Sequence, residues 1–153
     1  MERLNARVQI IWGLIALLAG AVLAAAVAGG LIWFDLGQPS IAVLVFALVA
    51  GLLLVHAHLR YRIWRFDVQT DALFLHRGVL TRVRTVVPYV RVQHVDTQRN
   101  PLERTIGLSR VVVYTAGSRG ADVTIPGLRP ERAESLQEQL RTLAGENDAD
   151  DGV

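Results

Sequence analysis

The chain has 153 residues, of which 52% are hydrophobic, and it contains no cysteine. The lack of cysteine excludes disulfides, zinc–thiolate sites, iron–sulfur clusters and cysteine nucleophiles. The formal charge is only +2, but residues 60–144 carry 14 arginines against eight carboxylates. An acidic stretch after them offsets this charge, with Glu146, Asp148, Asp150 and Asp151.

Two long uncharged segments lie near the N-terminus. Val8 to Phe34 can cross a hydrocarbon core, which needs about 20 residues. Turn residues follow, and Ser40 is expected to cap a second helix from Ile41 to Leu59. A cleaved secretory signal is the alternative for the first segment, but a signal's apolar region has only about 7–15 residues. The sequence therefore predicts a transmembrane helical hairpin over residues 8–59.

The flanking arginines predict its orientation. Arg3, Arg7, Arg60, Arg62 and Arg65 lie on one side of the hairpin, and the turn between the helices has none. Positive residues are retained in the cytoplasm, so both termini are expected there, with the chain in the plasma membrane. The last three arginines follow the second span directly and are candidate contacts for anionic lipid headgroups.

A stripe of small residues runs along the first segment at four-residue spacing, with Ala16, Gly20, Ala24 and Ala28. Small residues allow helices in lipid to approach closely. The partner is either the second helix or another copy of the chain, and a simple abundance of alanine explains the stripe equally well.

Residues 60–144 are expected to form a small domain of strands closed by one helix. Strand-like runs occur at residues 64–68, 72–76, 79–87, 91–97, 110–115 and 122–125. From Pro130 onward, Ala133, Leu136, Leu140 and Leu143 share one helical face. Gly145 is expected to end this helix, and the acidic residues 145–153 are expected to be disordered.

Three segments carry a resemblance to a known family: residues 77–80 (RGVL), 87–95 (VPYVRVQHV) and 101–108 (PLERTIGL). The shorter pieces at residues 115–117 (TAG) and 126–128 (PGL) fit the same series. In this order, after a membrane hairpin, they resemble the bacterial pleckstrin-homology domain proteins of the YdbS-like group.

The resemblance implies an α+β membrane protein, in which a transmembrane hairpin precedes a pleckstrin-homology-like β-barrel with one C-terminal capping helix. It also implies a non-enzymatic protein with a role in envelope maintenance or stress resistance. Arg91, Gln93 and Arg104 match the family's motif, and they either hold a loop on the barrel or form an interaction surface. A small oligonucleotide-fold-like barrel is the structural alternative, and the C-terminal helix argues against it.

No pattern in the sequence points to catalysis, a metal or a cofactor. The segment at residues 117–120 does not match a nucleophile elbow, and the chain has no lysine for a phosphate-binding loop. His56 and His58 are two residues apart and would point away from each other on a helix. His76, His94 and the aspartates at positions 67, 71 and 96 are expected to have structural roles. Nucleic acid is not an expected partner, because no exposed aromatic residues alternate with the arginines.

These observations predict a membrane-anchored binding or scaffold protein. Its expected partners are membrane lipid and another membrane protein or a second copy of itself. The alternative is an accessory subunit of a transport or pore assembly, although uncharged spans argue against a solute path. Conductance of the reconstituted protein would separate the two functions.

Overall fold

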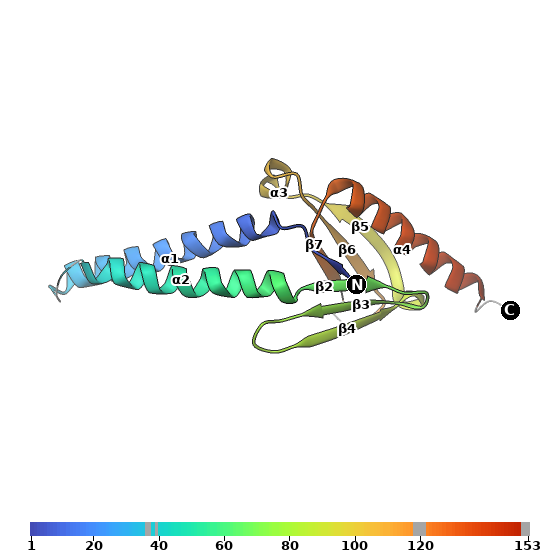
Figure 1. Ribbon diagram of the computed structural model, residues 1–153, viewed down its shortest axis with the longest axis horizontal. Helices are drawn as coiled ribbons and strands as arrows, with labels where there is room; N and C mark the ends of the chain where they lie inside the picture. Colours follow the sequence, from blue (N-terminus) through green and yellow to red (C-terminus); the bar gives the residue numbers. More distant parts are fainter. Residues whose placement is uncertain (36–37, 39, 118–121, 151–153) are drawn as a thin grey trace. The chain divides into compact units, whose positions relative to one another are not determined.

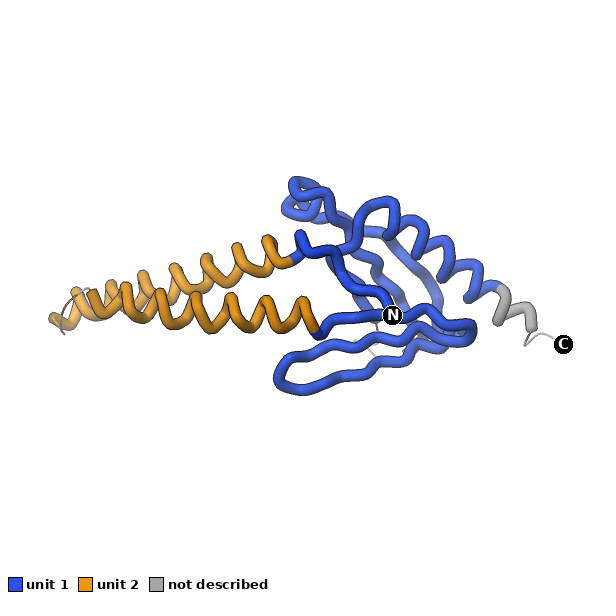
Figure 2. Tube along the Cα trace, viewed as in Figure 1, with its two compact units in different colours: residues 1–8, 63–153 blue, residues 9–62 orange. Residues whose placement is uncertain are grey.

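A computed structural model describes residues 1–35, 38, 40–117 and 122–150 of the chain. The chain divides into two compact units, shown in different colours in Figure 2. One unit contains residues 9–62 and the other contains residues 1–8 and 63–153. The second unit is therefore discontinuous in sequence, because the first is inserted into it.

The inserted unit is a pair of apolar helices, α1 (Val8–Trp33) and α2 (Ser40–Ile63) (Figure 1). Both are long and apolar enough to cross a membrane. Ser40 is the first residue of α2 and not a cap outside it. The helix also continues past the expected end at Leu59, because Arg60 to Ile63 contain no residue that stops a helix.

Gly20, in the small-residue stripe of α1, lies against α2. A Cβ atom added at Gly20 would lie 3.2 Å from the Cβ of Ala50, and Ala16 and Ala50 are both buried. At Gly20 the stripe therefore contacts the second helix, which is one of the two partners considered for it. In lipid there is no hydrophobic driving force between helices, so their association depends on close packing of this kind.

The second unit contains two antiparallel sheets (Figure 1). The first has the order β1–β2–β3–β4 and the second has the order β5–β6–β7. Their strands are β1 (Glu2–Arg3), β2 (Arg65–Val68), β3 (Ala72–Arg77), β4 (Val83–Pro88), β5 (Val92–Gln98), β6 (Ser109–Thr115) and β7 (Val123–Leu128). The sheets are separate ladders, so the expected barrel is an open two-sheet structure.

The strands after the hairpin occur in the predicted order, and one start is shifted by more than one residue. β4 begins at Val83 and not at Val79, because residues 78–82 form a turn. Gly78 has a φ of +95°, and a Cβ atom there would lie 1.9 Å from the carbonyl oxygen of Thr81. Glycine is therefore required at this position. The short helix α3 (Pro101–Thr105) and the strand β1 were not predicted.

The N-terminal segment, residues 1–8, joins the two sheets. β1 pairs with β2, and the backbone N–H of Asn5 then donates to the carbonyl of Gly127 in β7 at 2.8 Å. Gly127 has a φ of +65°, and a Cβ there would lie 2.7 Å from the Cβ of Val8. Leu4 and Val8 are buried. The helical hairpin is thus inserted in the sequence between β1 and β2, the first two strands of the domain.

The C-terminal helix α4 (Pro130–Asp150) packs on β5 and β6 through the buried residues Ala133, Leu136 and Leu140. Gln137 fixes its position, because its amide donates to the carbonyl of Val95 at 2.7 Å and accepts from the hydroxyl of Thr97 at 2.9 Å.

The end of α4 corrects one prediction. The helix passes through Gly145 and continues to Asp150, so residues 145–150 are helical and not disordered. A glycine inside a helix lowers its stability by only about 1 kcal/mol relative to alanine, so it does not have to end the helix. The expected disorder at residues 151–153 lies outside the described residues.

Candidate functional site

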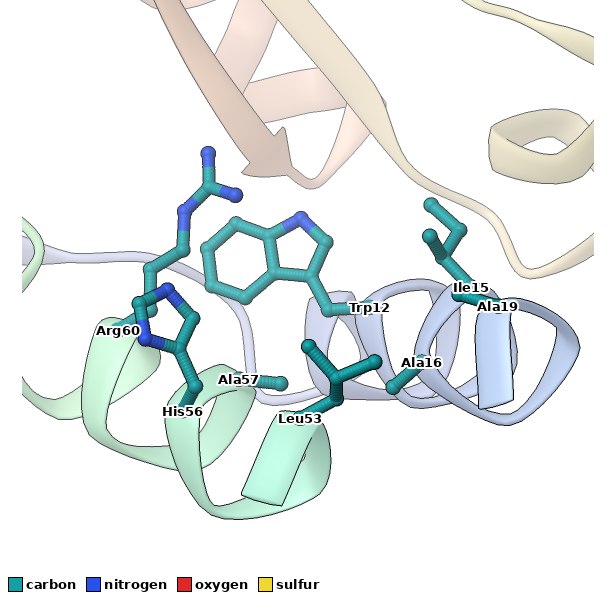
Figure 3. Close-up of a pocket in the computed structure, with 8 residues that line it drawn as sticks. All are labelled: Trp12, Ile15, Ala16, Ala19, Leu53, His56, Ala57 and Arg60. Atoms are coloured by element: carbon teal, nitrogen blue, oxygen red, sulfur yellow. The ribbon is translucent and has the colours of Figure 1, made fainter. Parts of the chain in front are cut away.

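A groove of about 190 Å³ lies between α1 and α2 near the ends of the hairpin that join the domain (Figure 3). Its walls are apolar except for two groups from α2, His56 and Arg60. Its lining residues are Trp12, Ile15, Ala16, Ala19, Leu53, His56, Ala57 and Arg60. Alanines at Ala16, Ala19 and Ala57 leave the space open, because larger side chains would fill it. An apolar groove with a cation at one end matches the chemistry of an anionic lipid.

Arg60 takes part in the wall of this groove. Its guanidinium carbon lies 4.3 Å from the centre of the Trp12 ring, a cation–π contact between α2 and α1. Indole rings favour the headgroup zone of a membrane, and this ring lies against the guanidinium. The sequence identified Arg60 as a residue flanking the second span but did not predict its contact with Trp12, which joins positions far apart in the chain.

The other two candidate headgroup contacts differ from Arg60. Arg62 is exposed on the last turn of α2. Arg65 is half-buried in β2, where it lies opposite Arg3 of β1 and His76 of β3 in the strand register. The three arginines therefore belong to different local environments, and Arg65 is part of a sheet.

A second hollow, of about 260 Å³, lies at the open seam between the sheets. Thr85 to Pro88 of β4 line one side, and residues 115–117 line part of the other. Arg91 also lines it, from the 3-10 turn at Tyr89–Arg91, and its carbonyl accepts from the N–H of Ala116 at 2.8 Å. β4 pairs only with β3 in the described ladders, so its other edge faces this seam.

The three residues of the predicted motif are not brought together. Arg91 precedes β5, Gln93 is exposed at a bulge near its start, and Arg104 is exposed on α3 beyond its end. The seven residues of β5 span about 23 Å. Arg91 is thus the member of the motif that lines the seam, while Arg104 lies at the opposite end of the strand.

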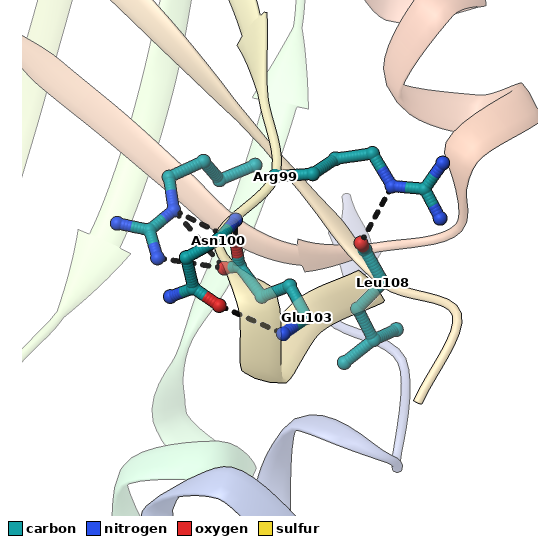
Figure 4. Close-up of polar contacts among 5 residues, drawn as sticks. Arg99, Asn100, Glu103 and Leu108 are labelled. Carbon is teal, nitrogen blue, oxygen red and sulfur yellow. Dashed lines mark hydrogen bonds and ion pairs between the residues drawn. The ribbon is translucent and has the colours of Figure 1, made fainter. Parts of the chain in front are cut away.

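The corner around α3 has a structural network (Figure 4). Asn100 caps the helix by accepting from the N–H of Glu103 at 2.7 Å, and Glu103 accepts from the N–H of Asn100 at 2.9 Å. Glu103 is only 3% exposed, and its carboxylate also forms an ion pair with the guanidinium of Arg110 at 3.0 Å. Arg99 donates to the carbonyl of Leu108 at 3.2 Å. This network holds the loop, and Arg104 joins it through its backbone N–H, which donates to the carbonyl of Asn100 at 2.9 Å.

Comparisons with known proteins identify the family. The family model for the bacterial PH domain matches residues 8–144, which is most of the chain. The chain belongs to the bacterial PH domain family. The same match includes α1 and α2, so the membrane hairpin is part of the family's pattern.

This bacterial PH domain protein is also similar to the transmembrane protein YdbS of Bacillus subtilis (strain 168). The two are 35% identical over 91 residues, which cover 60% of this chain and 55% of YdbS. The chain thus spans about half the length of that relative. No solved structure matches the chain. The two apolar helices and the transmembrane relative together show that it is a membrane protein.

The described part of the bacterial PH domain holds no group of three or more metal-binding side chains. His94 contacts Asp96 at 2.6 Å and stacks near Tyr114, with ring centroids 5.9 Å apart. His58 contacts Gln9 at 3.0 Å within the hairpin. His94 and His58 therefore contact other side chains of the protein itself. The PH domain family points to a non-catalytic protein.

Proposed function

We propose that this protein is a non-enzymatic, membrane-anchored binding module of the plasma membrane. Both of its termini and its PH-like domain face the cytoplasm. The interfacial groove binds anionic lipid, with the headgroup at Arg60 and an acyl chain along the apolar wall. The seam beside β4 docks an extended segment of a partner membrane protein.

The groove beside Arg60 carries this proposal. A cation near an anionic leaflet contributes about 1 kcal/mol, which is about a fivefold preference for anionic over neutral lipid. Arg62 and Arg65 add to this attraction from nearby positions in the sequence. The helices anchor the protein, so the arginines select lipids and do not retain the protein in the membrane.

Trp12 lines the groove and can report on the lipid within it. In a background with Trp33→Phe and Trp64→Phe, Trp12 is the sole tryptophan. Brominated phosphatidylglycerol should quench its fluorescence more strongly than brominated phosphatidylcholine. Replacing Arg60, Arg62 and Arg65 by glutamine should remove most of this difference, whereas Arg141→Gln on α4 should not. Equal quenching by the two lipids in the parent protein would contradict lipid selection.

The proposed docking of a partner rests on the edge of β4 that pairs with no strand among the described residues. An extended peptide can add to such an edge through backbone hydrogen bonds. A photo-crosslinking residue at Thr85, inside the seam, should form a discrete adduct in native membranes. The same residue at Thr124, exposed on β7, should not. Arg91→Glu should reduce the adduct at Thr85, and equal adducts at both positions would exclude specific docking at the seam.

A further inference from the structure

The turn between β3 and β4, residues 78–82, presents an isolated apolar side chain. Leu80 is 93% exposed at its tip, the most exposed aliphatic side chain among the described residues. The turn has a defined shape, because Gly78 adopts a positive φ that brings its α-carbon close to Thr81. Transfer of a leucine side chain from water into an apolar interface is favourable.

The charge around the tip is uniformly positive. Arg77, Arg82 and Arg84 are all exposed, and the chain has no carboxylate between Asp71 and Asp96. A leucine surrounded by arginines fits an anionic lipid surface, where the apolar group enters the interface and the cations remain at the headgroups. A protein surface would need matching carboxylates around an apolar pocket.

The strand register places this tip at the end of the sheet where the chain arrives from α2. α2 ends at Ile63, and β2 begins two residues later at Arg65, which pairs with His76 of β3. β3 is antiparallel to β2, so it returns toward that end. Leu80 follows His76 by four residues, which extend at most about 13 Å beyond the pair.

The length of α2 places its own last turn at headgroup level. Its 24 residues span about 36 Å, which exceeds a hydrocarbon core of about 30 Å. The final turn of α2 therefore lies among the headgroups when the helix spans the membrane. β2 begins two residues after this last turn, so the end of the sheet where β2 starts is tied closely to it along the chain.

We propose that the β3–β4 turn is a second membrane contact, in which Leu80 inserts into the interface of an anionic leaflet and the three arginines bind its headgroups. This inference rests on the proposed lipid contact of the module and assigns it a further site in the domain. The domain is then held to the lipid surface at two places, the hairpin connections and the turn.

The natural lack of cysteine allows a direct test with the full-length protein. Thr81→Cys keeps Leu80 and carries an environment-sensitive fluorophore at the tip, while Thr70→Cys carries it at the opposite end of the same strands. Vesicles contain either phosphatidylcholine alone or a mixture with phosphatidylglycerol. Spin-labelled lipid should quench the fluorophore at position 81 and not at position 70, with stronger quenching in the anionic vesicles. Leu80→Gln in the Thr81→Cys background should lose this quenching.

Two results would overturn the inference. Equal quenching of both positions by aqueous iodide would show that the tip is in water. Protection of position 81 from both iodide and spin-labelled lipid would show that a second copy of the chain covers it. In either case the Trp12 measurement remains independent: retained selectivity there means that only the turn contact fails, and lost selectivity means that the proposed lipid contact fails too.

Discussion

Glu103 shows how a single buried charge organises the domain. Its carboxylate caps α3 through Asn100 and pairs with Arg110, so three segments depend on it. We expect Glu103→Ala to lower the free energy of unfolding by about 3–5 kcal/mol, because Arg110 loses its partner in a half-buried position. Thermal unfolding of the full-length protein in detergent measures this. Glu134→Ala, on the exposed face of α4, is the control, and equal effects of both changes would show that the network is not required.

Tyr89 predicts a dependence on alkaline pH. Its buried phenol donates to the carbonyl of Gln69 at 2.8 Å. Burial, with smaller contributions from Asp71 and Asp67, raises the pKa of Tyr89 from 10.0 to about 12. The folded-state pKa is the higher one, so this stabilisation is complete below pH 10 and is lost as the pH rises through about 12.

Tyr89→Phe tests this assignment. The variant loses one hydrogen bond, so it should be less stable by about 1 kcal/mol at neutral pH. It should also lose less stability than the parent protein between pH 10 and 12. Unfolding curves of both proteins across this range give the comparison. Parallel curves would show that another group causes the alkaline loss.

The N-terminal segment is the element that the sequence did not reveal. β1 has only two residues, which is too short for any alternating pattern, and its partners lie more than 60 residues away in the chain. The longer elements were predictable because their own periodicity defines them: uncharged runs for α1 and α2, alternation for β2 and β3, and a spaced apolar face for α4. Contacts between distant residues, such as Arg60 with Trp12 or Glu103 with Arg110, leave no local pattern.

This segment makes a prediction about stability. Leu4 is 3% exposed, so Leu4→Ala should lower the free energy of unfolding by about 2–5 kcal/mol. Leu102→Ala is the matched control, because Leu102 is 51% exposed. The two variants are compared by thermal unfolding in detergent. Equal unfolding temperatures would mean that the segment is not docked in the domain.

The helical hairpin makes a separate prediction. Gly20 contacts Ala50, whereas Gly29 has no atom within 4 Å of an added Cβ. We expect Gly20→Leu to destabilise the hairpin by about 1–3 kcal/mol, because the extra atoms force the helices apart. Gly29→Leu should be tolerated. Resistance to denaturing detergent would measure the difference, and equal loss in both variants would exclude close packing at Gly20.

At the scale of the whole molecule, the domain and the membrane hairpin are interleaved. The chain enters the domain as β1, leaves it for α1 and α2, and returns as β2, so both connections to the membrane come from neighbouring strands. The domain is therefore connected to the membrane hairpin by two chain segments, one before α1 and one after α2.

The orientation of the chain tests this account most directly, because the lipid and partner contacts both require a cytoplasmic domain. Single cysteines at Gln38, in the turn between the helices, and at Thr70, in the domain, can be labelled without background because the chain has no other cysteine. A membrane-impermeant maleimide applied to intact cells should label position 38 and should label position 70 only after the membrane is opened. Labelling of position 70 in intact cells, with position 38 protected, would contradict the account.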